Sequence, residues 1–528
     1  MKKIIILASL ALLLTLAACS AGNLANDEMP ATAPDGAWSP PTTTEPAMPA
    51  SPALPSVETD MVADSELSLE DNFRFNMLDR ETHLQMTENE WRFPGTEAAI
   101  SFTLQMDTAS YRNVARMINN GRRPNPDAVR IAEMINYFNF DYVSPLVPGS
   151  PFSVYAEIGP SPFNSNSHLA FVRVRAQDID RAELPPSNLT FLIDTSGSMA
   201  SANRLPLVQQ SLALLVENLD ENDTISVVTY AGYTQVLLDS VPGNQHCVIM
   251  DAINGLRAAG STAGGPGISR AYELTMQNFD PSKNNRIILA TDGDFNVGVS
   301  TVAELTDMMS EYRQRGIYMT ILGFGMGNFR DDMLEAIARN GNANYHYIDT
   351  IQAAYKVFVE ELISNMFVIA EDVRTQIQFN PAFVENYRLI GYENRIIDNI
   401  DFDNDFRDAG EIGVGSEVVL MFELTLINTA PRSESIFDVL VRYHNPGEYV
   451  SNLITVPVGF DRILIQNSSD FNFAAAVAAF GHVLRGSEHT GNATYMWALD
   501  TARANLGQDR GGHRRTFVEL IETYRTIH

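Results

Sequence analysis

Cysteine and histidine are scarce in this sequence of 528 residues. Only Cys19 and Cys247 are cysteines, and nine residues are histidines. Two cysteines cannot supply the disulfide framework of a small secreted scaffold, so stability must come from apolar cores and bound metal. The chain also contains no His-Glu-x-x-His or Gly-x-Ser-x-Gly pattern, which removes the usual signatures of zinc proteases and serine hydrolases.

Basic residues are scarce as well. The chain has 36 Lys and Arg against 65 Asp and Glu, for a net charge of -29 and a pI near 4.6. Nucleic-acid binding needs clustered Lys and Arg, so this balance argues against it. Acidity of this kind favours cationic partners, metal ions included. The length predicts two to four domains, and the ordinary hydrophobic share of 45% predicts that most of the chain folds.

The N-terminus carries an apolar run over residues 4–14, directly after Lys2 and Lys3. This run is too short to span a membrane and indicates a secretory signal. Residues 16–20 read Leu-Ala-Ala-Cys-Ser, which resembles a bacterial lipobox. That pattern implies a signal peptide over residues 1–18 and a diacylglycerol on Cys19, which then leaves no pair of cysteines for an internal disulfide. The alternative is an ordinary signal peptide cleaved at the same bond.

The sequence predicts a disordered segment near the N-terminus and a folded part after it. Residues 19–68 are rich in Pro, Ala and Thr, cannot bury enough apolar surface to fold, and are predicted to be a disordered, partly extended tether. Folded structure is expected from about Thr96. Cys247 lies in an apolar helical stretch and is predicted to be a small buried side chain.

The middle of the chain, residues 187–365, alternates between strands and helices. Its strands are continuous apolar runs, as expected for strands buried on both faces of a parallel sheet. Amphipathic helices separate them. The fold class is therefore α/β, with a doubly wound, mostly parallel sheet of Rossmann-like type. The predicted strands cover residues 189–193, 225–228, 287–290 and 319–323.

Smaller regions flank this domain. Residues 96–186 predict an α+β region, with a helix whose N-cap is Asp107 or Ser110 and a strand pair at 152–158 and 169–174. Residues 366–528 predict a β-sandwich-like domain with a helical tail. Its expected strands are 373–379, 387–392, 418–427 and 437–443, and its expected helices are 473–484, 494–505 and 516–526.

Oxygen-bearing side chains lie in three loops, two of which directly follow buried strands. Residues 194–198 read Asp-Thr-Ser-Gly-Ser, residues 260–265 form a glycine-rich loop, and residues 291–294 read Thr-Asp-Gly-Asp. The carboxyl ends of parallel strands meet at one edge of a sheet, where ligands bind. Hard oxygen donors from separate loops suit Mg2+, which favours octahedral coordination.

These residues resemble the metal-ion-dependent adhesion site of von Willebrand factor A domains. The resemblance implies that Mg2+, or Mn2+ or Ca2+ in its place, is held with one coordination position open to a partner's carboxylate. Asp294 is a lesser candidate, and a solvated turn carboxylate explains it equally well. The implied metal ligands are Asp194, Ser196, Ser198, Thr262 and Asp292.

A wider resemblance joins the chain to the YfbK-like bacterial lipoproteins, which carry an A domain between characteristic N- and C-terminal regions. It extends over nearly everything from Thr96 onward. Pro266 and Ser416 depart from the family pattern, and neither is an implied metal ligand. The stretches that carry the resemblance are residues 106–111, 127–138, 322–328 and 387–395.

Three functions are compatible with these patterns. The first is a membrane-anchored binding or scaffold protein of the cell envelope, without catalytic residues, that faces outside the cytoplasm. The second is a structural component of an envelope complex, whose metal only stabilises the fold. The third and weakest is a metal-dependent hydrolase, because His246 and His346 are isolated from any motif. Ser20 implies the outer membrane where a cell has one.

The lipobox leads to the first prediction. Replacing Cys19 with Ala removes the acylated thiol, so the protein should move from the membrane fraction to the soluble envelope or medium fraction. The measurement is cell fractionation with a thermal melt of the released protein, which should remain folded. A variant that still sediments with the membrane contradicts the lipid anchor.

Overall fold

The computed structural model describes residues 81–527, except 105–106, 143, 263, 294–301, 327–328, 407 and 428–432. Cys19 and the predicted signal peptide and tether lie outside these residues. Ordered structure begins before the predicted Thr96, because residues near 82 and 92 already form β-bridges to Arg330 and Tyr387. Within the described part, no helix has the length and apolar character needed to cross a membrane.

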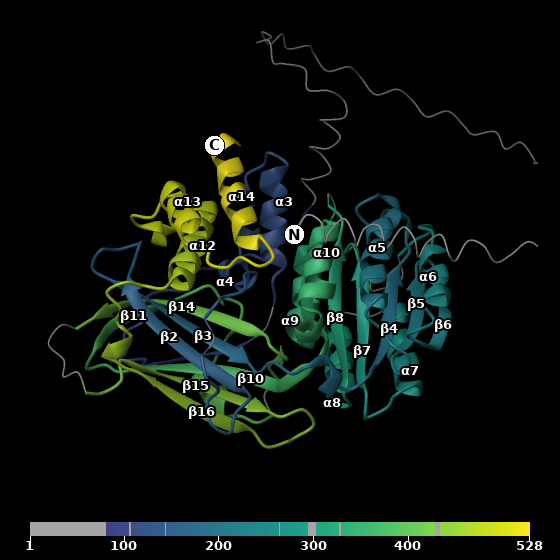
Figure 1. Cartoon of the computed structure of the whole chain (residues 1–528), viewed down its shortest axis with the longest axis horizontal. Helices are drawn as coiled ribbons and strands as arrows, with labels where there is room; N and C mark the ends of the chain where they lie inside the picture. Colours follow the sequence, from purple (N-terminus) through teal and green to yellow (C-terminus); the bar gives the residue numbers. More distant parts are fainter. Residues whose placement is uncertain are drawn as a thin grey trace, which may run out of the picture. The chain divides into compact units, whose positions relative to one another are not determined.

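The predicted α/β domain contains one six-stranded sheet in the order β6-β5-β4-β7-β8-β9 (Figure 1). All neighbouring pairs are parallel except β5 and β6, which are antiparallel. The predicted doubly wound, mostly parallel sheet is therefore confirmed, and the antiparallel edge strand is an addition. The strands are β4 (Ser187–Asp194), β5 (Thr224–Tyr230), β6 (Thr234–Pro242), β7 (Asn284–Thr291), β8 (Ile317–Phe324) and β9 (Asn344–Ile348).

Helices cover both faces of this sheet because alternate residues of each strand point to opposite sides. On β4, Phe191 and Ile193 belong to one apolar core with α5, α6 and α10, whereas Leu192 belongs to a second core with α7, α8 and α9. The helices are α5 (Leu205–Val216), α6 (His246–Asn254), α7 (Gly264–Gln277), α8 (Val302–Gln314), α9 (Asp331–Gly341), α10 (Ile351–Tyr355) and α11 (Leu362–Met366).

The predicted burial of Cys247 is wrong. Helix α6 buries Ile249 and Ile253 against the sheet, and Cys247 lies on its exposed side. The helix begins at His246, so the apolar residues before Ile249 lie in its first turn and do not reach the core.

The residues before and after the α/β domain build a β-sandwich together. Strand β1 (Ala99–Thr103) pairs with β10 (Val368–Phe379), and β3 (His168–Ala176) pairs with β14 (Glu417–Leu426). The two flanking regions therefore share both sheets. The sheet orders are β12-β1-β10-β15-β16, with β13 on β10, and β11-β14-β3-β2. The remaining strands are β2 (Phe152–Pro160), β11 (Val384–Ile390), β12 (Ile396–Ile397), β13 (Gly410–Gly413), β15 (Phe437–His444) and β16 (Asn452–Val458).

A layer of helices covers the outer face of the sheet that contains β14. Leu420 and Phe422 point into the sandwich core, while Val419 and Met421 join a separate core with the helices. The three helices and four strands predicted for residues 366–528 are confirmed, whereas β12, β13 and β16 were not predicted. The helices of this layer are α3 (Ala109–Asn119), α4 (Ile131–Asn136), α12 (Ser469–Arg485), α13 (Tyr495–Ala504) and α14 (His513–Ile527).

The predicted N-cap of α3 is wrong. Thr108 occupies the N-cap position, and its side chain makes no capping hydrogen bond. The carboxylate of Asp107 instead accepts a hydrogen bond from the backbone N–H of Tyr345 on β9 and pairs with Arg395. Asp107 thus joins three distant segments of the chain, a role that the local sequence does not indicate.

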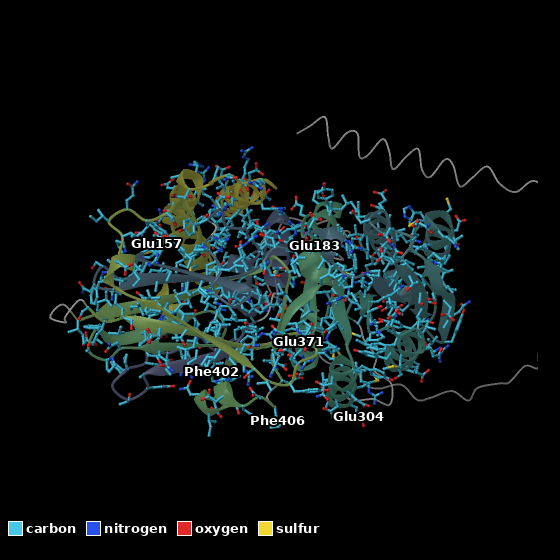
Figure 2. The ribbon with its side chains drawn as sticks, turned by 60° about the horizontal axis from the view of Figure 1, so that its bottom comes forward. Glu157, Glu183, Glu304, Glu371, Phe402 and Phe406 are labelled. Atoms are coloured by element: carbon cyan, nitrogen blue, oxygen red, sulfur yellow. The ribbon has the colours of Figure 1, made fainter. Side chains whose placement is uncertain are left out.

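Buried charges join the α/β domain to the sandwich. Tyr318 of β8 donates a hydrogen bond to Glu371 of β10, which is labelled in Figure 2. Arg313 of α8 lies 3.1 Å from the carboxylate of Asp372 and 3.6 Å from that of Glu411. Burial raises the pKa of Glu411 to about 7, against the opposing effect of the arginines nearby.

The raised pKa of Glu411 leads to a prediction about stability. The folded protein keeps a proton on this group up to about pH 7, whereas the unfolded chain loses it near pH 4.5. The contribution of Glu411 to the free energy of unfolding is therefore present at low pH and is lost as pH rises through 7. Glu411→Gln, which cannot ionise, should remove this loss, an effect of up to roughly 3 kcal/mol at 1.36 kcal/mol per pKa unit.

Urea denaturation of wild type and Glu411→Gln below and above this pH interval measures the difference. Glu434→Gln is the matched control, because Glu434 is exposed and should leave the wild-type pH profile unchanged. Parallel profiles for wild type and Glu411→Gln would contradict the assignment.

Candidate metal site at the carboxyl edge of the parallel sheet

Strand β4 places Asp194 at the carboxyl edge of the sheet, between β5 and β7. The side chain is fully buried, and Oδ1 accepts a hydrogen bond from the backbone N–H of Ser196 at 2.8 Å. The hydroxyls of Ser196 and Ser198 lie 3.0 Å apart. The turn after β4 therefore gathers one carboxylate and two hydroxyls, as the sequence predicts.

Neighbouring strands hold the other oxygen of Asp194. Oδ2 accepts hydrogen bonds from the hydroxyl of Tyr230, the last residue of β5, at 3.2 Å and from the hydroxyl of Thr291, the last residue of β7, at 3.1 Å. Burial raises the pKa of Asp194 to about 6, hydrogen bonds from Ser196 lower it, and the nearby charge of Asp292 raises it further. The two carboxylates thus lie close enough to interact at the edge of the sheet.

The glycine-rich loop passes directly beside the turn after β4. The backbone N–H of Gly197 donates to the carbonyl of Gly260 at 2.9 Å, and a Cβ on Gly197 would lie 3.2 Å from that oxygen. A side chain at position 197 would therefore be a tight fit against this carbonyl. Thr262 follows two residues later and is partly exposed; no hydrogen bond of its side chain occurs among the described residues.

Asp292 completes the set from the loop after β7. It is fully buried, and its Oδ2 lies 2.8 Å from the guanidinium of Arg204 at the start of α5. Arg204 also donates to the carbonyl of Ser198 at 2.6 Å and to that of Met326 at 2.9 Å. A side chain at Gly325 would overlap Arg204, so this glycine leaves room for the arginine.

The donor set fits a hard divalent cation. Two buried carboxylates and the two serine hydroxyls come from turns held together by direct hydrogen bonds, and the loop of Thr262 is tied to the same turn. Oxygen donors of this kind are the ligands of Mg2+, Mn2+ and Ca2+. Asp194, Ser196, Ser198, Thr262 and Asp292 would hold the ion, and Arg204 offsets part of the negative charge. Asp294 lies outside the described residues.

Sequence reasoning missed three residues around this site: Arg204, Tyr230 and Thr291. Thr291 directly precedes Asp292, and Tyr230 ends β5, two residues beyond the predicted strand 225–228, so their proximity follows once the strand order is known. The contact of Arg204 depends on how α5 packs, and the only sequence signal was the glycine at 325 that makes room for it.

Three protein-family models match parts of this chain. Residues 188–365 match the family model described as von Willebrand factor type A domain. Residues 77–171 match a second model described as von Willebrand factor, and residues 364–527 match one described as Uncharacterized protein YfbK, C-terminal. The α/β domain is thus a von Willebrand factor type A domain, which indicates a protein-interaction or adhesion-type role.

Individual relatives define the family more closely. Uncharacterized protein YfbK of Escherichia coli is 40% identical over 461 residues, which cover 83% of this chain and 80% of that protein. The chain therefore belongs to the YfbK family. Uncharacterized protein sll0103 of Synechocystis is 27% identical over 297 residues, covering 54% of this chain and 68% of that protein. Among solved structures, von Willebrand factor type A from Catenulispora acidiphila is similar with a TM-score of 0.42 and 15% identity, over 69% of this chain and 89% of that one.

The donor set predicts the consequence of losing one carboxylate. Asp194→Ala leaves mostly neutral hydroxyls, so isothermal titration with Mg2+ should show one site in wild type and none detectable in the variant. Asp307→Ala, which removes an exposed carboxylate of α8, is the matched control and should bind as wild type does. Equal Mg2+ binding by wild type and Asp194→Ala would sink the proposed ligand set.

Proposed function

We propose that this protein is a lipid-anchored binding or scaffold protein of the cell envelope. The five oxygen donors at the edge of the parallel sheet hold a divalent cation, for which Mg2+ is the first candidate. A carboxylate of a partner protein completes the coordination of the ion. The A domain supports the interaction role, whereas the ion, the anchor and the partner are parts of the proposal.

The exposure of the donors carries this proposal. Asp194, Ser196 and Asp292 are buried, whereas Ser198 and Thr262 are partly exposed. An ion bound by all five donors would have the two buried carboxylates on its protein side. The partly exposed hydroxyls of Ser198 and Thr262 would lie on its solvent side. Neutral hydroxyls on that side leave the ion electrophilic, which favours an outside carboxylate as the last ligand.

A cavity of about 540 Å3 next to the site offers room for a partner. It is lined by Thr195 and Gly260, which adjoin the donors, and by Tyr233 and Arg257 farther out. Tyr233 is 73% exposed, and large exposed aromatic side chains are common anchors of protein interfaces. Arg257 adds a positive charge that suits an acidic partner segment.

The anchor and the location complete the proposal. A diacylglycerol on Cys19, followed by the Pro-rich tether, would hold the folded part outside the cytoplasm and away from the membrane surface. A structural role for the ion is the competing interpretation. The two differ in one respect: a structural ion stabilises the fold whether or not a partner is present, whereas a recognition ion governs capture.

Thr262 provides the variant that separates these interpretations. Thr262→Ala removes one partly exposed hydroxyl, so the fold should lose only about 1 kcal/mol. Capture of envelope proteins in the presence of Mg2+ should weaken and approach the level seen with chelator. The measurement is co-purification from envelope extract with Mg2+ and with chelator, alongside thermal melts.

Ser261→Ala is the matched control for this experiment. Ser261 is an exposed hydroxyl of the same loop and is not among the proposed ligands. The Ser261→Ala variant should capture the same proteins as wild type with the same dependence on Mg2+. If Thr262→Ala retains the same partners and wild-type capture is insensitive to chelator, the ion is structural and the adhesion interpretation fails.

A further inference from the structure

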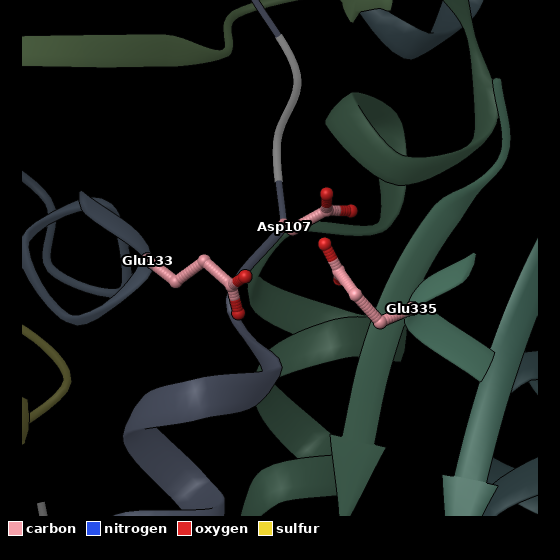
Figure 3. A group of neighbouring side chains, drawn as sticks. All are labelled: Asp107, Glu133 and Glu335. Atoms are coloured by element: carbon pink, nitrogen blue, oxygen red, sulfur yellow. The ribbon is translucent and has the colours of Figure 1, made fainter. Parts of the chain in front are cut away.

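A second group of acidic side chains lies at the junction between the A domain and its flanking regions. Asp107 precedes α3, Glu133 lies on α4, and Glu335 lies on α9 of the A domain. All three are buried, and one carboxylate oxygen from each lies within 4.8 Å of those from the other two. In Figure 3, Glu133 and Glu335 extend toward Asp107 from opposite sides.

Protein groups satisfy the first two carboxylates. Asp107 accepts from the backbone N–H of Tyr345 at 3.1 Å and pairs with Arg395. Glu133 accepts from the backbone N–H of Ser110 at 2.9 Å and pairs with Arg130. These contacts fix the two carboxylates in place, and each oxygen retains a lone pair for a further interaction.

Glu335 is different. Its side chain is 2% exposed, and its nearest cation is Arg395, at 3.7 Å from Oε1. Oε2 is buried, and no hydrogen-bond partner for it occurs in the part of the chain that the structure describes. A buried carboxylate oxygen without a partner costs several times RT in free energy, so an atom of this kind points to a bound group that satisfies it.

The charges of this cluster do not balance. Asp331, on the first turn of α9, pairs with Arg130 at 2.6 Å and with His83 at 3.0 Å. With the imidazole counted as neutral, four carboxylates face the guanidinium groups of Arg130 and Arg395. With every carboxylate ionised, the cluster would carry an excess of two negative charges in a buried position, which a divalent cation would neutralise.

A small cavity adjoins the three carboxylates. Its volume is about 30 Å3, and Asp107, Glu133 and Glu335 line it together with Arg395 and the side of Tyr392. This volume is large enough to admit one ion. Ligand oxygens of Ca2+ lie at about 2.4 Å from the ion, so oxygens within 4.8 Å of one another can share one Ca2+.

We propose that Asp107, Glu133 and Glu335 form a second metal site that binds Ca2+ between the A domain and its flanking regions. Three carboxylates offer up to six oxygens, and Ca2+ accepts bidentate carboxylates in irregular geometry. Mg2+ is usually bound through one or two carboxylates in strict octahedral geometry, so a cluster of three carboxylates suits Ca2+ better. This site differs from the one at the sheet edge, where hydroxyls and loops reach solvent.

The bound ion would fasten three parts of the chain to one another. Glu335 belongs to the A domain, while Asp107 and Glu133 belong to the segment before it, and Arg395 reaches the same point from the sandwich. Ca2+ would therefore set the orientation of the A domain on its support.

The test is isothermal titration of the full-length chain with Ca2+ in excess Mg2+, so that the sheet-edge site is already filled. Wild type should bind one Ca2+, and Asp194→Ala should bind it equally. Glu335→Gln keeps the shape of the side chain and removes its charge, so its affinity for Ca2+ should fall at least about tenfold. Asp332→Asn removes a carboxylate of the same helix outside the cavity and should bind as wild type does.

Thermal melts with Ca2+ and with chelator provide an independent measurement. Ca2+ should raise the Tm of wild type and Asp332→Asn but not that of Glu335→Gln. Absence of Ca2+ binding by wild type in excess Mg2+, or equal binding by wild type and Glu335→Gln, overturns the proposal. Either outcome leaves the Mg2+ site untouched, because that site is tested separately by Asp194→Ala.

Discussion

The hydrogen bonding of β4 on both of its edges is the constraint on which the sheet-edge site depends. Residues 187–194 are buried throughout, and the strand pairs in parallel with β5 and β7. The chain must therefore leave the sheet at Asp194 with its carboxylate still inside the protein. The carboxylate costs free energy there unless it is satisfied, and the last residues of both neighbouring strands supply hydroxyls to it. The same geometry brings Asp292 to the edge from β7.

Buried charged residues also lie at the junction between the A domain and the rest of the chain. Arg130, Arg313 and Arg395 each reach carboxylates on another part of the molecule. Such pairs stabilise a fold only modestly, because desolvation offsets much of the attraction, but breaking one is costly. They thus specify one arrangement of the domains more than they add to its stability, and a divalent cation among the carboxylates would strengthen that selection.

The two metal sites would have different tasks because their donors differ in exposure. Partly exposed hydroxyls at the sheet edge leave an ion accessible to a partner. The carboxylates of the junction are buried, so an ion there would act mainly on the protein that surrounds it. An A domain held rigidly on its support would present the sheet-edge ion in a fixed direction, which lowers the entropy cost of capturing a partner.

The sequence alone determined the α/β class, four of the six strands of the A domain and the loops that carry the five oxygen donors; the edge strands β6 and β9 were not predicted. These features depend on local patterns: continuous apolar runs, helical periodicity, and Asp, Ser and Thr placed directly after strands. The predicted C-terminal strands and helices followed from the same patterns. The antiparallel edge strand β6 did not, because its residues are only partly buried and form no continuous apolar run.

Tertiary structure decided what depends on residues far apart in the chain. Residues 96–186 and 366–528 appear as separate regions in the sequence, yet β1 pairs with β10 and β3 with β14, since pairing between distant strands leaves no local signal. Asp107 reads as a helix cap, and only packing brings it to Glu133 and Glu335. The contact of Arg204 with Asp292 arises in the same way. The positions of most strands follow from local sequence patterns. Which charged side chains become buried together depends on how the domains pack, because these residues are far apart in the chain.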